Sequence, residues 1–487
     1  MLANVPRPVR GACYTRVAPT PVAAPRLLAW SDSLGELLRI ARPASLEDVE
    51  VFAGNRVLEG MQPYAARYGG HQFGHWAGQL GDGRAITLAE VIATDGSRQE
   101  LQLKGAGKTP YSRTADGRAV LRSSVREFMC SEAMHWLGVP TTRALSLAGT
   151  GETVIRDMFY DGRPEAEPGA IVCRVAPSFV RFGNFQILAA SSELDALKRL
   201  ADYVIREHFP GHSYAGWYHE VCRRTGALMA DWMRLGFVHG VMNTDNLSIL
   251  GLTIDYGPYG WLEGYDPEWT PNTTDAQGRR YAYGSQPDIA LWNLARLAEA
   301  LLPLIAREEL EKGLELYAET FQNSWQQALA QKLGLVSLDQ TLAPALFAAL
   351  SEAETDFTLF FRNLARVPLD ESAPDAALLA PLRRAFYGEP GRSLAAWLRR
   401  YMTEVKDKGV EARIERMNAV NPKYVFRNYL AQQAIDALAQ GDASVLERLM
   451  KVLERPYDEQ PENDALAERR PEWARHKPGC SALSCSS

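Results

Sequence analysis

The sequence lacks a hydrophobic run long enough to cross a membrane. Its most apolar stretch, AEALLPLIA from Ala298, is short, whereas a membrane-spanning helix needs about 20 residues. A basic excess is also missing, because the net charge is -6 at pH 7 and nucleic-acid binding usually needs a positive surface. The first residues, MLANVPRPVRGACY, hold no continuous apolar segment typical of a signal peptide. We therefore expect a cytoplasmic protein with neither a membrane nor a nucleic acid as partner.

Cysteine is scarce, with six residues in a chain of 487, so a secreted type of disulfide framework is excluded. Cys480 and Cys485 lie in the small, polar tail PGCSALSCSS, where no local sequence would bury them. We expect these two thiols to be present for their reactivity. The other four lie among apolar neighbours and are expected in the core: Cys13, Cys130, Cys173 and Cys222.

The composition is that of a globular protein, with 46% hydrophobic and 23% charged residues. From about residue 61 to 180, short β-type runs alternate with glycines, as in GRAITLAEVI, ELQLKG and GAIVCRVA. One long helix, SSVREFMCSEAMHWLG, interrupts them; a capping box of Ser124 and Glu127 predicts its start, and Gly138 its end. From about 185 to 450, amphipathic helices dominate. This order predicts an α+β protein with two lobes.

The stretch LQLKGAGKTPYS contains two lysines that could hold a nucleotide. Gly107-Lys108-Thr109 matches the end of a P-loop, but Gln102 stands where the first glycine is required, and Pro110 follows where a helix should continue. By contrast, Lys104 ends an alternating strand that begins at Glu100. Protein kinases present their phosphate-binding lysine from a strand in this way.

Further kinase-type features follow Lys104 in the expected order. A glycine-rich hairpin precedes it, with Gly81 and Gly83 ahead of a strand, although such glycines also serve ordinary turns. Glu127, in the first turn of the long helix, is expected to orient the lysine as well as to cap the helix. His239 and Asn246 have the spacing of a kinase catalytic loop.

Asp255-Tyr256-Gly257 matches the kinase D-F-G motif, and Asn246 and Asp255 are hard oxygen ligands suited to Mg²⁺. One position departs from the pattern: Val241 occupies the place of the kinase catalytic aspartate, and Asp245 is the nearest carboxylate. Phosphate transfer to a hydroxyl is therefore disfavoured. The motifs predict a bilobal protein-kinase-like fold in four parts: an extension (1–60), a nucleotide-binding N-lobe (61–182), a helical C-lobe (183–420) and a C-terminal extension (421–487).

Three segments resemble the selenoprotein O family of kinase-like protein adenylyltransferases: RYGGHQFGHWAGQLGDGR, LQLKGAGKTPYSRTADGRAVLRSSVREF, and HGVMNTDN with IDYGPYG. The resemblance implies that ATP binds in a flipped orientation and that AMP, not phosphate, is transferred. It also implies Asp245 as general base, and Asn246 and Asp255 as ligands of Mg²⁺. Mn²⁺ is the alternative metal. The implied nucleotide contacts are Gly81, Gly83, Arg84, Lys104, Asp116, Gly117, Arg174 and Arg181.

The place of Cys485 and the pair of His71 and His75 each lead to a further expectation. Cys485 occupies the place of the selenocysteine of animal members, but no cysteine lies between Gly257 and Ser285. The disulfide that ties the tail to this segment in some members therefore cannot form, and Cys485 would pair with Cys480 or with a target protein. His71 and His75 could be a zinc pair, but the glycines around them argue against a helix and favour packing.

The resemblance implies an enzyme that transfers AMP from ATP to Ser, Thr or Tyr hydroxyls of proteins, and we expect a monomer. UMP transfer from UTP, an ordinary kinase and a catalytically inactive nucleotide-binding scaffold are the alternatives. Val241 argues against the kinase and is the feature that favours the scaffold. No motif names the protein substrates.

Overall fold

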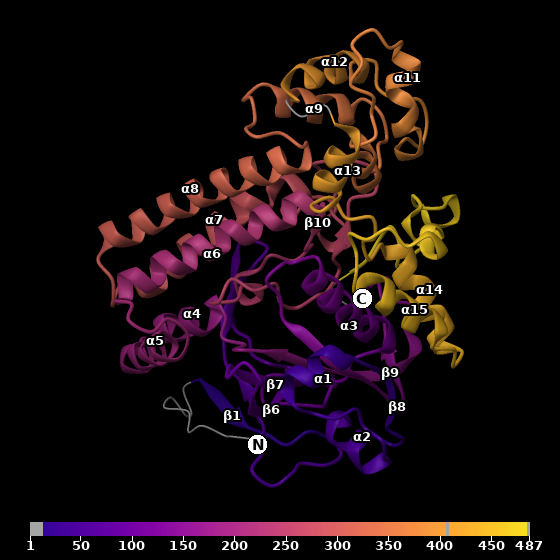
Figure 1. Cartoon of the computed structure of the whole chain (residues 1–487). Coiled ribbons are helices and arrows are strands. Elements are labelled where there is room, and N and C mark those ends of the chain that lie inside the picture. The colour runs from indigo at the N-terminus through magenta and orange to yellow at the C-terminus, as the bar shows by residue number, and fades with distance from the viewer. Residues whose placement is uncertain (1–12, 406–408, 485–487) are drawn as a thin grey trace.

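The computed structural model describes residues 13–405 and 409–484. It is a mixed α/β structure with a large antiparallel sheet and many helices. Figure 1 shows the strands gathered at one end of the molecule and the helices of residues 340–420 at the other. The long α8 (Arg307–Lys332) runs between these two ends.

The large sheet has seven strands in the order β1-β3-β6-β7-β9-β8-β2, and every neighbouring pair is antiparallel. Both edge strands come from residues before 61, so the segment 1–60 contributes directly to this sheet. The strands are β1 (Tyr14–Arg16), β2 (Arg26–Trp30), β3 (Tyr64–Ala66), β6 (Ala85–Ile92), β7 (Arg98–Lys104), β8 (Arg143–Arg156) and β9 (Glu165–Ala176).

The central strand β7 confirms the predicted alternation. Leu101 and Leu103 pack into an apolar cluster with residues of β6, α1 (Asp32–Leu38) and α2 (Leu46–Ala53). Gln102 lies on the opposite face, where it contacts Arg174. Lys104 ends the strand and is paired in register with Ala85 and Val172. The sheet therefore fixes the backbone of Lys104 from both sides.

The chain before the predicted glycine-rich hairpin forms a hairpin of its own. Strands β4 (Gly69–Gln72) and β5 (His75–Gln79) form a separate two-stranded sheet that extends the β3 and β6 pair. Between the two sheets, Leu80 N donates to Tyr68 O and Asp82 N donates to Ala66 O. The chain thus remains paired on both sides of the stretch Gly81 to Gly83.

The helix α3 (Leu121–Trp136) corrects one prediction. It begins three residues before Ser124, its N-cap is Val120, and no side chain caps it. Ser124 instead donates to Ala170 O in β9, and Glu127 lies in the second turn, facing Lys104. The predicted capping box was wrong because the Ser124 hydroxyl bonds to the sheet. A local sequence motif does not predict such a contact. Gly138, with φ of 78°, follows the end of the helix as expected.

The turn that bears Asp245 packs against α4 (Phe182–Ala190), α7 (Gln286–Leu301) and β4. That turn is a short 3-10 helix, η1 (Thr244–Asn246), between β10 (Phe237–Val238) and β11 (Gly260–Trp261). The helices of this part are α4, α5 (Leu194–His208), α6 (Tyr214–Leu235), α7 and α8. Other 3-10 turns are η2 (Thr273–Asp275), η3 (Tyr283–Ser285), η4 (Ala380–Ala385), η5 (Pro461–Ala467) and η6 (Glu472–Ala474).

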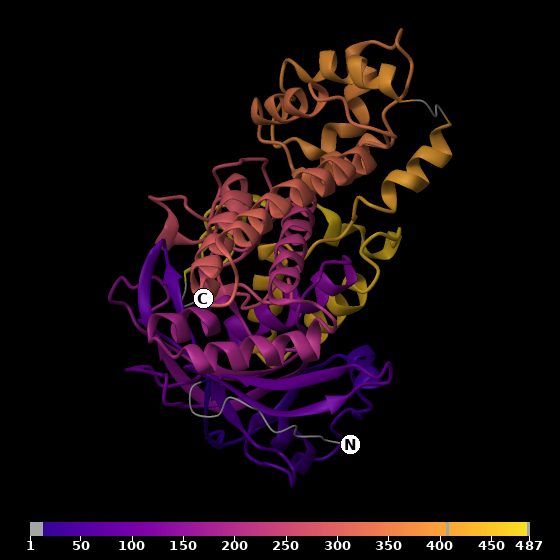
Figure 2. The same cartoon turned by 90° about the vertical axis from the view of Figure 1, so that its left-hand side faces the viewer.

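A second apolar cluster lies at the far end of the molecule, where a group of helices stands away from the sheet in both views (Figures 1 and 2). A buried ion pair between Asp356 and Arg427 ties this group to the C-terminal helices. The group comprises α9 (Leu342–Ser351), α10 (Phe357–Leu364), α11 (Asp375–Leu379), α12 (Leu394–Glu404) and α13 (Val410–Asn418). It is followed by α14 (Asn428–Ala439) and α15 (Ser444–Leu453), which pack against α3 (Figure 1).

The cysteines divide differently from the prediction. Cys13, Cys130, Cys173 and Cys222 are buried as expected. Cys480 is also buried, at 2% exposure, and burial raises the pKa of its thiol to about 11. The expectation of an exposed, reactive Cys480 was wrong, because Asn428 of α14 donates to Cys480 O and holds the tail against the helices. Cys485 lies outside the described residues.

Among residues 13–405 and 409–484, no helix is both long and apolar enough to span a membrane.

Candidate active site

An open cleft of about 1800 Å³ lies where the sheet, the glycine-rich stretch and the η1 turn meet. Most of the residues predicted to bind nucleotide or metal line it: Gly81, Gly83, Arg84, Lys104, Asp116, Gly117, Arg174, Asp245, Asn246 and Asp255. Glu127 and Arg181 do not line the cleft; each supports a residue that does. The lining also includes Arg113, Arg118, Arg156 and Tyr160, which sequence reasoning missed.

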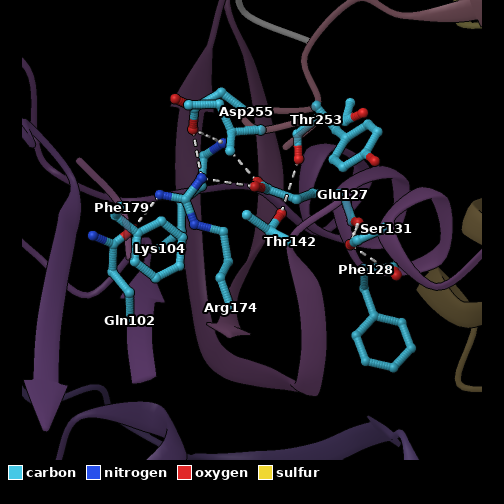
Figure 3. Close-up of polar contacts among 12 residues, drawn as sticks. Gln102, Lys104, Glu127, Phe128, Ser131, Thr142, Arg174, Phe179, Thr253 and Asp255 are labelled. Atoms are coloured by element: carbon cyan, nitrogen blue, oxygen red, sulfur yellow. Dashed lines mark hydrogen bonds and ion pairs between the residues drawn. The ribbon is translucent and has the colours of Figure 1, made fainter. Parts of the chain in front are cut away.

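Lys104 is held by two carboxylates, as Figure 3 shows. Its Nζ lies 2.6 Å from Glu127 Oε2 and 3.6 Å from Asp255 Oδ1. Burial lowers the pKa of Lys104, although Glu127 and Asp255 oppose that shift. The predicted lysine and glutamate pair is therefore present. Lys108, the P-loop alternative, is exposed in a loop, and the next helix begins only at Leu121.

Two arginines complete a cluster of cations around Asp255. Arg174 Nη1 lies 2.9 Å from Glu127 Oε1 and 2.5 Å from Asp255 Oδ1 (Figure 3). Arg181 Nη1 contacts Asp255 Oδ2 and donates to Asp245 O at 2.8 Å. Both guanidinium groups are buried, and the nearby carboxylates outweigh burial and raise their pKa values.

The cations around Asp255 keep its carboxylate ionised. Burial opposes the charge, but Arg181, Arg174 and Lys104 outweigh it and hold the pKa well below the usual range. Its φ of 56° is in the left-handed region, which aspartate tolerates better than most residues. One carboxylate thus joins three cations from β7, β9 and the start of α4.

Asp245 has the opposite electrostatic setting. Its side chain is buried, Gln72 Nε2 lies 3.3 Å from its Oδ2, and its Oδ1 has no hydrogen-bond partner among the described residues. Burial raises its pKa to about 6, and Arg181 only partly opposes this shift. A Cβ at Gly70 would lie 2.3 Å from Oδ1. Only glycine therefore lets β4 approach the carboxylate so closely.

His239 and Asn246, the two residues of the kinase-type spacing, fix the loop around Asp245. His239 stacks on Trp232 with ring centres 5.3 Å apart, and its Nε2 contacts Ile254 O at 2.8 Å. Asn246 Nδ2 donates to Val241 O at 3.0 Å, which leaves its amide oxygen available as a ligand. Val241 lines the cleft with an apolar side chain, so the position of a kinase base carries no proton acceptor.

The loop after β7 depends on glycines at close approaches. A Cβ at Gly117 would lie 2.2 Å from the backbone of Gly107, and one at Gly81 would lie 2.4 Å from the Tyr111 ring. Asp116 accepts two hydrogen bonds from Arg156, both at 2.7 Å. Asp116 and Gly117 therefore fix the cleft wall. Arg156 comes from β8, 40 residues away in the sequence, so its contact with Asp116 was not predicted.

The cleft offers oxygen donors that fit a hard cation. Asn246 and Asp255 both line it, and the buried Oδ1 of Asp245 beside them lacks a partner among the described residues. Within residues 13–405 and 409–484, no three His, Cys, Asp or Glu side chains form a metal cluster. Two protein oxygens in an open cleft are a ligand set that fits Mg²⁺, which keeps several waters and is shared with substrate phosphates.

His71 packs, as expected, and does not form a zinc pair with His75. Its ring lies 5.0 Å from that of Trp76 and 5.5 Å from that of Trp292. Burial is the main cause that lowers the pKa of His71. His75 is exposed on β5.

A buried lysine and two arginines gathered on carboxylates at the floor of a large polar cleft define an enzyme of the phosphate-handling class. The chain belongs to the family described as "Protein adenylyltransferase SelO", which matches residues 9–454. This confirms the resemblance to the selenoprotein O family and identifies the protein as a nucleotidyltransferase.

Several curated relatives carry the name "Protein nucleotidyltransferase YdiU". One from Nitrosospira multiformis is 64% identical, covering 99% of this chain and 93% of its own length. One from Azoarcus sp. is 60% identical, covering 99% and 95%. One from Xanthomonas euvesicatoria is 57% identical, covering 98% and 95%.

Proposed function

We propose that the protein transfers AMP from ATP to Ser, Thr or Tyr hydroxyls of protein substrates and releases pyrophosphate, on a bilobal kinase-like scaffold. One observation carries this proposal. The position of a kinase base holds Val241, while the buried Asp245 lies four residues later beside Asn246. The pairing of Lys104 with Glu127 at 2.6 Å supports the kinase-like part.

In this reaction the hydroxyl oxygen attacks the α-phosphorus of ATP. A bond from that phosphorus to the acceptor oxygen forms, the bond to the bridging oxygen of the β-phosphate breaks, and pyrophosphate leaves with the electron pair. The hydroxyl proton passes to Asp245, whose raised pKa suits a group that must accept and then release a proton. General base catalysis of this kind contributes about 10²- to 10⁴-fold.

The cations of the cleft would hold the charge of the leaving pyrophosphate. Lys104 and Arg174 line the cleft and are fixed by Glu127 before any substrate binds, so little reorganisation is needed during reaction. Arg84 and Arg113 also line it and form no ion pair with a carboxylate among the described residues. We assign these four cations to the phosphates of ATP, with Arg174 able to form the forked hydrogen bonds that phosphate favours.

Asn246 and Asp255 would hold Mg²⁺, or Mn²⁺, which would neutralise phosphate charge and polarise the α-phosphate. Asp255 already lies among Lys104, Arg174 and Arg181. We infer that Lys104 and Arg174 keep their contacts with Glu127 when ATP binds, and that their contacts with Asp255 are replaced by contacts of Asp255 with the metal.

Labelled nucleotides test the reaction. We expect label on protein from α-labelled ATP and none from γ-labelled ATP. Label only from the γ-position would indicate a kinase, and label from neither would indicate the inactive scaffold that Val241 also favours. The same assay with α-labelled UTP decides between AMP and UMP transfer.

Asp255→Ala tests the metal assignment. We expect it to abolish transfer and, in isothermal titration with Mn²⁺ and a non-hydrolysable ATP analogue, to remove metal binding. Asp370→Ala is the control, because Asp370 lies outside the cleft and only accepts hydrogen bonds from Ser372 in an exposed turn. Full activity or unchanged metal affinity in Asp255→Ala would contradict the assignment.

A further inference from the structure

The hairpin of β4 and β5 has two faces with different neighbours. Gly70 and Gln72 face Asp245: a Cβ at Gly70 would lie 2.3 Å from Asp245 Oδ1, and Gln72 contacts Oδ2. Gly69 and His71 face the other way, since a Cβ at Gly69 would lie 2.5 Å from the Trp76 ring. The hairpin thus separates the cleft from a second surface.

That second surface is an open groove of about 640 Å³, here called the hairpin groove. Its walls combine three alanines and Trp76 with the polar His71 and Gln186. Arg296 and Glu299 also line it and form an ion pair at 2.7 Å. Trp76 is 40% exposed, which is unusual for a side chain of its size. The groove is lined by His71, Trp76, Gln186, Ala189, Arg296 and Ala300, among others.

The outer edge of β5 is unpaired. The sheet contains only β4 and β5, and β4 packs against α4 and η1, so β5 lies outermost. Four of its five residues are exposed. Among the described residues no other strand pairs with this edge, and such an edge is a template for an added strand.

Charge at the hairpin turn favours an acidic occupant. A Cβ at Gly74 would lie 3.4 Å from Arg280 Cζ, and this guanidinium lies 4.6 Å from the centre of the Trp292 ring. Within residues 13–405 and 409–484, Arg280 forms no ion pair, and its buried Nε has no hydrogen-bond partner. Arg280 is half-buried and acts electrostatically on the nearby buried Asp275. The outer part of this cation, held on an aromatic ring, is a preformed contact for a further carboxylate.

We propose that the protein substrate binds as an extended segment along the outer edge of β5, with an acidic residue at Arg280. Successive side chains of a strand point to opposite faces. One side chain of the added strand, the acceptor Ser, Thr or Tyr, therefore faces the Asp245 side of the hairpin. Its two neighbours face the hairpin groove and pack against Trp76. This inference rests on the proposed function, since it names how the acceptor of that reaction is held.

Two fluorescent peptides test the surface. One carries a single tyrosine between valines with an aspartate near one end, and its twin carries lysine in place of that aspartate. We expect the wild-type protein, measured by fluorescence anisotropy without ATP, to bind the aspartate peptide more tightly. Arg280→Glu should weaken this binding by roughly fivefold to tenfold and favour the lysine twin. Trp76→Ala should weaken both peptides by roughly tenfold.

Two matched controls accompany these variants. Arg279→Glu changes the net charge equally at an exposed residue that pairs with Glu268 at 3.9 Å. Trp473→Ala removes another exposed tryptophan, 47% exposed and remote from the hairpin. Neither should change the Kd of either peptide. Equal affinity of wild type and Arg280→Glu for both peptides, or an equal effect of the controls, would overturn the proposal.

Transfer from α-labelled ATP to the same peptides separates the two proposals. If docking is correct, KM follows the measured Kd while kcat stays near its wild-type value. Peptide binding with the expected charge preference but no transfer would contradict the proposed function and support the docking surface. If the KM of transfer is unchanged in both Trp76→Ala and Arg280→Glu, the result would support the function and overturn the docking surface.

Discussion

Asp245 and Asp255 are ten residues apart and have opposite protonation behaviour. Asp255 has three cations around it and stays ionised, whereas Asp245 is buried with one unpartnered oxygen. Pairs of carboxylates whose environments separate their pKa values are typical of sites in which one binds charge and the other moves a proton. This difference is the residue-scale basis of the roles we propose for them.

The pKa of Asp245, about 6, predicts a pH dependence of transfer. A general base must be deprotonated, so kcat/KM should rise with pH through about 6 and then reach a plateau. The measurement is kcat/KM for α-label transfer from pH 5 to 8 at saturating metal. A profile that stays flat from pH 5 to 7 would contradict a base with this pKa.

Asp245→Asn should stabilise the fold at neutral pH while it reduces transfer. The folded-state pKa of Asp245 lies above its usual value of 3.8, so ionising this group costs folding free energy. That cost is absent below pH 3.8 and complete above about pH 6; it amounts to about 3 kcal/mol at about 1.4 kcal/mol per pKa unit. Urea unfolding at pH 8 and pH 4 should show a gain for the variant at pH 8 only. Equal stability of both proteins at pH 8 would disprove this account.

At the scale of elements, the β4 and β5 hairpin and the η1 turn are built as one unit. His71 N donates to Thr244 Oγ1 at 2.7 Å, and Tyr281 OH donates to Asn243 Oδ1 at 2.6 Å. A Cβ at Gly183 of α4 would lie 2.0 Å from Gly69 O. The position of the Asp245 carboxylate therefore depends on how closely three backbones approach.

Gly70→Ala tests this dependence. Its added methyl group would lie 2.3 Å from Asp245 Oδ1, so either the carboxylate or the hairpin must move. We expect kcat to fall about 10²-fold, the effect of a displacement of about 1 Å at a reacting group, while nucleotide affinity changes little. Gly388→Ala is the control, because nothing lies within 4 Å of its added Cβ. Unchanged kcat in Gly70→Ala would show that the hairpin does not position Asp245.

At the scale of the whole molecule, the C-terminal tail reaches the segment that follows the D-Y-G motif. Thr273 N donates to Leu483 O at 2.7 Å, and Leu483 N donates to Pro271 O at 3.0 Å. Ser484 Oγ donates to Met158 O in the loop between β8 and β9. Hydrogen bonds therefore join the tail to this segment, where the cysteine needed for the family disulfide is absent.

Truncation after Lys477 should destabilise the protein. It removes the buried Leu483 and Cys480 and their backbone contacts, and we expect a loss of about 2 to 4 kcal/mol in urea unfolding. Limited proteolysis should then cut faster between residues 262 and 285. Removal of residues 485–487 alone keeps those contacts and serves as control. Equal proteolysis rates for the two truncations would argue against a supporting role of the tail.

Local patterns predicted the parts of the site that neighbouring residues determine. Alternation predicted the orientation of Lys104, and motif spacing predicted the Asn246 turn and Asp255. The pairing of Asp116 with Arg156 and the support of Asp255 by Arg181 were beyond such reasoning, since side-chain contacts between segments 40 residues or more apart create them.

The two wrong predictions have the same physical origin. The Ser124 hydroxyl donates a hydrogen bond to β9 and does not cap the helix. Cys480 is held in a buried position by a hydrogen bond from α14. In each case a contact between distant segments replaced the local expectation.

The pairing of the tail with the segment at Asn272 also has a practical use. Thr274, next to the hydrogen-bonded Thr273, lines the cleft. The hydroxyl of Ser484 contacts the loop that carries Tyr160, another residue of the cleft wall. The described part of the tail, up to Ser484, is therefore a natural attachment point for a reporter whose emission follows occupancy of the cleft without any substitution inside it.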